Sequence, residues 1–203
     1  MANDYIGVVT PKGTAIYPHL TQPDTKFNAM GEYKVSLAID EAEAAPIVED
    51  IEQALEQAKK MIPQGKPKKM AEPPYFNEVD NDGQETGRIV FKFKMKAKIN
   101  TKDGRTIEMS PKLFDAQGRL INDLESIWGG STLRVSADLV PYYVATTGAG
   151  VSARLKAVQI IELKTGGGSN ASSFGFEATE GYTAPDEEAA ESEGFVHEED
   201  EDF

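Results

Sequence analysis

Hydrophobic and polar residues alternate one by one along three separate segments of the chain. In residues 33–39 and 133–139 every second side chain is apolar, and most of the side chains between them are polar. A period of two is typical of β-strands that bury one face. Residues 151–163 begin with the same alternation, but their apolar positions change phase at Val158. Such a phase change indicates a bulge or bend within the strand.

A different spacing predicts one helix, at residues 46–62. Its apolar positions fall on one helical face, and Pro46 suits the first turn, with Asp40 or a nearby acid as the cap. The basic Pro/Gly loop of residues 63–69 follows. In residues 73–76, Pro-Pro-Tyr-Phe, the two prolines argue against regular structure. The apolar positions of the helix are Ile47, Ile51, Leu55, Ala58 and Ile62.

Turn signals separate the remaining apolar segments like the hairpins of an antiparallel sheet. They are Asp82-Gly83, Asp103-Gly104 and Gln117-Gly118. Together these features predict a mainly β domain, an OB-fold-like five-stranded antiparallel barrel with one helix inserted between early strands. Periodicity alone leaves a β-sandwich open as the alternative.

The strand expected at residues 89–99 has two chemically different faces. One face is apolar, and the other carries Lys92, Lys94, Lys96 and Lys98 at intervals of about 7 Å. These lysines either guard an edge strand against aggregation or form a track for a phosphate backbone. On the second interpretation further cations come from neighbouring strands and from the basic loop, namely Arg134, Arg154, Lys156, Lys66, Lys68 and Lys69.

Aromatic residues near these cations are candidates for stacking on unpaired bases. Tyr142 and Tyr143 follow Pro141 at a strand end, where strand alternation would bury one ring and expose the other. The other candidates are Trp128, before a Gly-Gly turn, and Tyr75 and Phe76, beside the basic loop. For each of them burial in the core is the competing interpretation.

Charge is segregated along the chain. Residues 166–203 contain 12 of the 34 acidic residues and none of the 21 lysines and arginines. We therefore expect a disordered acidic interaction tail at 166–203, following a folded domain at 1–165. A role in solubility alone would not need the final aromatic ring, which with a carboxylate offers a partner protein something to bind. The tail ends in Glu198, Glu199, Asp200, Glu201, Asp202 and Phe203.

The composition argues against several chemical functions. The chain has no cysteine, which removes disulfides, thiol nucleophiles and thiolate metal ligands. With only His19 and His197 as histidines, no arrangement of base and nucleophile is visible. We expect no enzymatic activity, no cofactor and no metal site. The first residues lack the features of a secretory signal and no membrane span is visible, so we expect a cytoplasmic protein.

Several short motifs, taken in order, resemble the single-stranded-DNA-binding proteins of tailed-bacteriophage replisomes. The resemblance covers most of residues 30–165 and the terminus. It rests on Phe91-Lys92-Phe93-Lys94, Phe114-Asp115-Ala116-Gln117-Gly118, Gly129-Gly130-Ser131-Thr132-Leu133-Arg134-Val135, Leu139-Val140-Pro141-Tyr142, residues 150–163 and the terminal Asp202-Phe203.

The resemblance implies an OB fold whose sheet face binds single-stranded DNA in phage replication and recombination, in the host cytoplasm. It also implies annealing of complementary strands, and an acidic tail that contacts the phage DNA polymerase and helicase-primase. Lys92, Lys94 and Tyr142 match family-like DNA contacts, and Asp202 and Phe203 match the docking end of the tail. The chain departs from the family at Lys96, where relatives can place an aromatic residue.

Two other functions stay open at this level. An RNA-binding OB module would use the same lysines and rings, because contacts to a 2′-hydroxyl cannot be recognised in a sequence. A protein-interaction adaptor would need the tail but not the lysine strand. The oligomeric state also stays open, with a homodimer among the alternatives.

Overall fold

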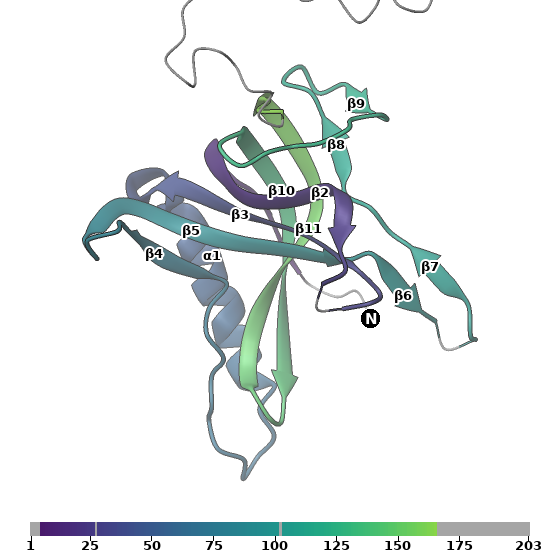
Figure 1. Ribbon diagram of the computed structural model, residues 1–203. Helices are drawn as coiled ribbons and strands as arrows, with labels where there is room; N and C mark the ends of the chain where they lie inside the picture. The colour runs from purple at the N-terminus through teal and green to yellow at the C-terminus, as the bar shows by residue number, and fades with distance from the viewer. Residues whose placement is uncertain (1–4, 27, 102, 166–203) are drawn as a thin grey trace, which may run out of the picture. The chain divides into compact units, whose positions relative to one another are not determined.

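The alternating segments form the strands of a β-sheet that closes on itself (Figure 1). The computed structural model describes residues 5–26, 28–101 and 103–165, which form eleven strands and one helix. The expected acidic tail lies outside these residues, so the tail and the domain boundary at residue 165 stay predictions. The elements are β1 (Ile6–Val9), β2 (Gly13–Asp24), β3 (Glu32–Asp40), α1 (Glu41–Lys60), β4 (Tyr75–Val79), β5 (Glu85–Lys96), β6 (Lys98–Asn100), β7 (Thr106–Glu108), β8 (Lys112–Phe114), β9 (Leu120–Ile121), β10 (Thr132–Val144) and β11 (Gly148–Glu162).

Five of the strands make a ring. Hydrogen-bonded neighbours run from β2 to β3, β5, β11 and β10, and β10 returns to β2 at Thr14 and Gly13. The OB-like five-stranded barrel is therefore confirmed, and the sandwich alternative is wrong because the sheet closes. The pairing is not antiparallel throughout, since β5 and β11 run parallel where Lys94 meets Arg154. Strands β1, β4, β8 and β9 extend the sheet beyond the ring, and β6 and β7 form a separate hairpin.

The interior of the ring is filled by the apolar positions that the alternation marks. Their side chains are almost completely buried, and burying each contributes about 1.5–3 kcal/mol. The phase change near Val158 is confirmed as an irregularity, because Lys156 is an extra residue between the β11 partners of Ser136 and Ala137. The largest buried side chains include Phe91, Phe93, Leu37, Leu133, Leu139 and Leu155.

The helix starts five residues earlier than its spacing predicts. It begins at Glu41, directly after the end of β3, and Pro46 lies inside it rather than in its first turn. Proline cannot donate the hydrogen bond that this position normally makes, but Ala44, Ile47 and Ile51 bury the adjacent face, so packing outweighs the loss. Asp40 is the N-terminal cap residue, although its side chain makes no capping hydrogen bond. Among the described residues, no helix is both long and apolar enough to cross a membrane.

The three expected hairpin turns are confirmed, between β4 and β5, β6 and β7, and β8 and β9. The exclusion of regular structure from residues 73–76 is wrong in part, because Tyr75 and Phe76 begin β4. A proline carbonyl can still accept a hydrogen bond, and Pro74 accepts one from the N–H of Lys92 at 2.8 Å. A strand can therefore start directly after the two prolines.

One buried polar side chain joins the N-terminal segment to the barrel. Thr10 is fully buried, and its Oγ1 accepts a hydrogen bond of 2.9 Å from the N–H of Val135. We expect Thr10→Val to destabilise the fold by about 1–3 kcal/mol, because the replacement keeps the shape but leaves that N–H without a partner. Chemical denaturation of the two proteins measures the difference. Thr10→Ser keeps the oxygen, so a serine variant as unstable as the valine variant would contradict the explanation.

Candidate nucleic-acid interface

The lysines of β5 lie in the middle of the sheet. Lys92, Lys94 and Lys96 are exposed, while Phe91, Phe93 and Met95 between them are buried. Along one side β5 pairs with β3 from Asp40 to Glu32, and on the other it pairs with β4 and β11. The edge-strand interpretation is therefore wrong, because both sides of β5 are already hydrogen bonded.

Strand register brings further side chains to the same face. Lys34 and Ser36 of β3 lie opposite Lys94 and Lys92, and Arg154 of β11 lies beside Lys94. Directly opposed residues point to the same side of a sheet. The sequence does not mark Lys34 as a DNA-binding candidate, because a single lysine in an alternating strand does not reveal which residues of the partner strand it will face.

The charges on this face differ in whether an acid neutralises them. Lys34 pairs with Asp24 at 2.5 Å, and Lys156 pairs with Asp138 at 3.0 Å. On this face of the sheet, four of the described cations have no ion pair within 4.0 Å. These uncompensated cations are Lys92, Lys94, Lys96 and Arg154.

Two of these cations lie over aromatic rings instead. Lys92 Nζ is 4.8 Å from the centre of the Phe76 ring, and the Arg154 guanidinium is 5.5 Å from the centre of the Tyr5 ring. A ring face attracts a cation without cancelling its charge. Both groups therefore keep their full positive charge for a ligand.

The surface is hollowed between these cations. One hollow of about 310 Å³ is lined by Tyr17, Lys34, Lys92 and Lys94. A second, of about 330 Å³, is lined by Lys94, Lys96 and Arg154 together with apolar side chains of the β6–β7 hairpin. The two share Lys94 and Glu32 and so adjoin. We call the surface lined by Tyr17, Lys34, Lys92, Lys94, Lys96 and Arg154 the lysine groove.

Lys98 does not continue the row. The chain bends at Ala97, whose N–H donates to the carbonyl of Gly31 at 3.0 Å, and Lys98 belongs to β6. It is paired with Glu108 at 2.9 Å. The expected single strand over residues 89–99 is thus wrong at its end, because β5 stops at Lys96.

Arg134 lies apart from the lysine groove. Its Nε donates to the carbonyl of Thr10 at 3.1 Å, and it lines a hollow with Val9 and Phe114. That hollow and the lysine groove have no lining residue in common.

A second cationic area lies where the β10–β11 hairpin meets the basic loop. Lys69 accepts a backbone hydrogen bond of 3.0 Å from Ala149, and its Nζ donates to the carbonyl of Thr146 at 3.0 Å. Lys66 and Lys68 are exposed on the same loop. We call Lys66, Lys68, Lys69, Tyr142 and Tyr143 the hairpin corner. Figure 1 shows this hairpin reaching beyond the ring alongside α1.

Tyr142 lies across a glycine. It pairs with Gly150, where an added Cβ would be only 2.7 Å from the Tyr142 hydroxyl oxygen. Because Gly150 has no Cβ, it leaves room for the Tyr142 ring. The expectation of one buried and one exposed tyrosine is wrong, since Tyr142 and Tyr143 are both half-buried.

Along β11, Gly150 and Arg154 are about 13 Å apart and point to the same face, so this strand links the hairpin corner to the lysine groove.

The remaining aromatic candidates divide between core and surface. Tyr75 is half-buried against the core, packing on Phe91 with ring centres 5.9 Å apart, and burial raises its pKa above the usual range. Phe76 is exposed beside Lys92. Burial is the wrong interpretation for Trp128, whose exposed fraction is 52%. Trp128 lies outside the lysine groove, in a hollow that also includes Tyr17.

Tyr17 was missed at the sequence level although it is 83% exposed. Its φ is 46°, a left-handed conformation that costs a residue with a Cβ about 1–2 kcal/mol. Tyr17 and Pro18 together oppose Val35 alone between the pairs Ile16–Ser36 and His19–Lys34. This is a β-bulge. Strain of this kind gathers at functional sites, but nothing in the local sequence pattern reveals it.

In the part of the chain that the structure describes, no three His, Asp or Glu side chains lie close enough to hold a metal ion. The lysine groove and the hairpin corner offer a ligand positive charge and ring faces.

Comparison with known proteins identifies the family. The family model described as "Single-stranded DNA-binding protein, Bacteriophage T7" matches residues 12–163. The chain belongs to the T7 single-stranded DNA-binding protein family. The single-stranded DNA-binding protein of Enterobacteria phage T3 is 30% identical over 196 residues, which cover 87% of this chain and 84% of that protein. The resemblance to phage single-stranded-DNA-binding proteins is therefore confirmed.

Solved structures agree with this assignment. The crystal structure of gp2.5, a single-stranded DNA-binding protein encoded by bacteriophage T7, has a TM-score of 0.68 and 29% identity, covering 89% of this chain and all of that one. The single-stranded DNA-binding protein of bacteriophage Enc34, in complex with single-stranded DNA, has a TM-score of 0.55. At 14% identity, over 81% of this chain and 94% of that one, it is a likeness of fold. The T7 family match includes most of the described domain but stops before the acidic tail.

The charge pairing in the lysine groove of this T7-family protein can be tested by titration. The hydrogen bond from Lys34, assisted by the N–H of Lys26, holds the pKa of Asp24 below its usual range. We expect Lys34→Met to raise the pKa of Asp24, followed by NMR of the side-chain carboxyl carbon. Lys94→Met is the matched control and should leave this pKa unchanged, because no ion pair joins Lys94 to Asp24.

The sign of the accompanying stability effect follows from linkage. A carboxyl whose pKa is lowered in the folded state adds stability above its unfolded pKa and loses it as the pH falls through the folded value. Any advantage of the parent over Lys34→Met that comes from this pair should therefore vanish in acid. An Asp24 pKa that does not move in Lys34→Met would show that Lys34 is not neutralised by this pair.

Proposed function

We propose that this protein binds and protects single-stranded DNA through the lysine groove and the hairpin corner, during phage DNA replication and recombination. The observation that carries the proposal is the group of four uncompensated cations on the exposed face of β5 and β11. In OB folds, oligonucleotides bind the face of the second and third barrel strands and the loop between the last two. Here these are β3, β5 and the β10–β11 hairpin.

Binding of this kind divides between two chemical parts. The ammonium and guanidinium groups of the lysine groove neutralise phosphates and release counterions, whatever the base sequence. Tyr142, at the hairpin corner, supplies a ring on which a base can stack, and every base has a π-face to offer it. The protein would therefore cover any exposed strand with little sequence preference.

The names of the relatives support the same function. The matched proteins of phages T3 and T7 are single-stranded DNA-binding proteins, and the Enc34 structure contains single-stranded DNA. We propose a binding role and no enzymatic one, in the host cytoplasm. The tail would dock the phage DNA polymerase and helicase-primase through Glu198, Glu199, Asp200, Glu201, Asp202 and Phe203, and the bound strands would anneal with complementary ones.

RNA binding and a pure adaptor role make different predictions. An RNA-binding module would bind a ribo-oligonucleotide more tightly than the deoxyribo-oligonucleotide of the same sequence, because 2′-hydroxyl contacts decide the preference. An adaptor would show no nucleic-acid binding once residues 166–203 are deleted. A gel shift of the full chain and this deletion against single-stranded DNA, double-stranded DNA and single-stranded RNA of the same sequence separates the three functions.

Removing charge from the lysine groove should weaken DNA binding at every base sequence. We expect Lys92→Ala, Lys94→Ala and Lys96→Ala together to reduce the slope of log K against log salt by about 2, since each lost phosphate contact removes about 0.7. Fluorescence anisotropy of a labelled oligonucleotide over a salt series measures this slope. The fold should be intact, because all three side chains are exposed.

A matched control removes the same charge elsewhere. Arg88, Arg105 and Arg119 are each ion-paired, with Glu78, Asp103 and Asp115. Their triple alanine variant should keep most of the salt slope. Equal slopes for the lysine variant and the parent would exclude the lysine groove as the phosphate-binding surface.

Tyr142 should contribute through its ring rather than its hydroxyl. We expect Tyr142→Ala to lose about 1–3 kcal/mol of binding free energy and Tyr142→Phe to lose little, because stacking requires only the ring. Titration of both variants with the same oligonucleotide gives the two values. Similar losses in both would point to a hydrogen bond from the hydroxyl instead.

A further inference from the structure

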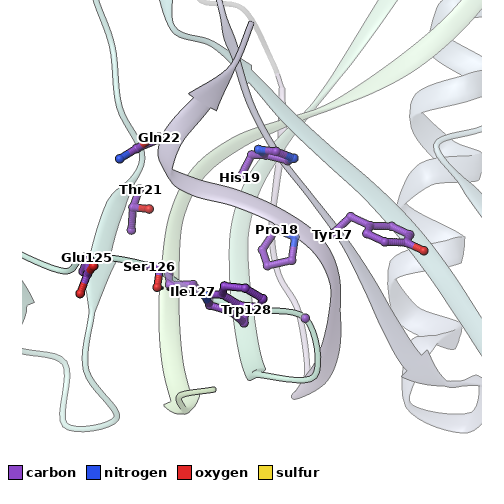
Figure 2. Close-up of a pocket in the computed structure, with 10 residues that line it drawn as sticks. Tyr17, Pro18, His19, Thr21, Gln22, Glu125, Ser126, Ile127 and Trp128 are labelled. Atoms are coloured by element: carbon purple, nitrogen blue, oxygen red, sulfur yellow. Dashed lines mark hydrogen bonds between the residues drawn. The ribbon is translucent and has the colours of Figure 1, made fainter. Parts of the chain in front are cut away.

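A hollow on the other side of Tyr17 from the lysines extends the same surface. It has a volume of about 550 Å³ and lies between β2 and residues 125–129 (Figure 2). Tyr17, Pro18 and His19 line it from β2, and Ile127 and Trp128 line it from the facing segment. Of the described residues that line it, none is Lys or Arg. It offers a ligand ring faces rather than positive charge.

Trp128 presents an exposed ring on a fixed backbone. Its N–H donates to the carbonyl of Lys164 at 2.8 Å, and its carbonyl accepts a 2.8 Å bond from the hydroxyl of the fully buried Ser131. The indole N–H donates to the hydroxyl of Ser126 at 3.0 Å. The polar edge of the ring is thus satisfied within the protein. These hydrogen bonds hold Trp128 in place, and the exposed part of its indole ring is available to contact a ligand.

Tyr17 connects this hollow to the lysine groove. Tyr17 is one of the lining residues of both hollows. In Figure 2 its ring points away from Trp128 as well as from Glu125 and Ser126, so the two rings do not face one another. Its strained left-handed backbone and high exposure mean that burial of the ring does not offset the strain. An exposed aromatic ring held at a strained bulge suggests a ligand contact.

We infer that Tyr17 and Trp128 form a stacking subsite for bases of single-stranded DNA, which continues the path of the strand beyond the lysine groove. This inference rests on the proposed function. A strand whose phosphates lie over Lys92 and Lys94 reaches Tyr17 at the end of the groove, and its next bases enter the hollow beside Trp128. Because no lysine or arginine lines the hollow, the subsite adds stacking and no phosphate neutralisation.

Trp128 is the single tryptophan of the chain, so its emission reports the subsite directly. The experiment titrates the full-length protein with oligothymidylates of about 4 to about 16 nucleotides, which spans the site sizes of OB folds. Short oligonucleotides that fill only the lysine groove should bind with little change in emission. Longer ones should quench it and bind more tightly. Saturable binding at every length with unchanged emission would overturn the inference.

Ring-removing variants test the energetic contribution by anisotropy. Trp128→Ala should weaken binding of the long oligonucleotide about tenfold, with Trp128→Phe close to the parent, because stacking is worth this much per base. The slope of log K against log salt should not change, in contrast to the lysine variant. A lost slope, or an unchanged affinity in Trp128→Ala, would contradict a stacking subsite.

Tyr17→Gly separates stacking from a structural role. Glycine adopts positive φ without strain, so this variant should unfold at the same or a higher temperature than the parent while binding the long oligonucleotide about tenfold more weakly. Tyr17→Phe should bind normally. Unchanged affinity in Tyr17→Gly would overturn the inference and leave the proposed function in place if the lysine variant still loses its salt slope. Failure of the proposed function itself would appear as absence of DNA binding by the parent.

Discussion

The parallel pairing of β5 with β11 is the contact on which the rest of this structure depends. It closes the five-stranded ring at Lys94 and Arg154, and so it sets two positive charges beside each other. Like charges on neighbouring strands cost about 0.2–1 kcal/mol. The same closure buries Phe93 and Leu155, each worth about 1.5–3 kcal/mol. Core packing thus exceeds the repulsion, and the fold can hold a concentrated positive surface without neutralising it.

The distribution of acids determines which cations are available to a ligand. Lys34, Lys98 and Lys156 each have a carboxylate within 3.0 Å. Lys92, Lys94 and Lys96 of β5 and Arg154 of β11 have no such carboxylate among the described residues. A row of lysines in a sequence therefore overstates the usable charge at its end, and the sequence does not show that Lys156 is paired while Arg154 is not. Only the three-dimensional arrangement of acids separates the two classes.

The sequence was informative wherever a local periodicity carried the information. Alternation located β3, β10 and the lysine face of β5, because side-chain direction follows directly from position in a strand. It could not supply register, which brings Lys34 opposite Lys94, since partner strands are distant in sequence. The bulge at Tyr17 was missed for a related reason. Its left-handed backbone is imposed by the pairing of β2 with β3 rather than by the residue itself.

The central position of β5 limits how any strand of nucleic acid can lie on it. Its backbone N–H and C=O groups are committed to β3 on one side and to β4 and β11 on the other. A ligand on this face can be held only by side chains, through phosphates and ring faces. Such contacts leave the Watson–Crick edges of the bases unoccupied. Under the proposed function, a complementary DNA strand would therefore have access to these edges, and base pairing could begin before the protein dissociates.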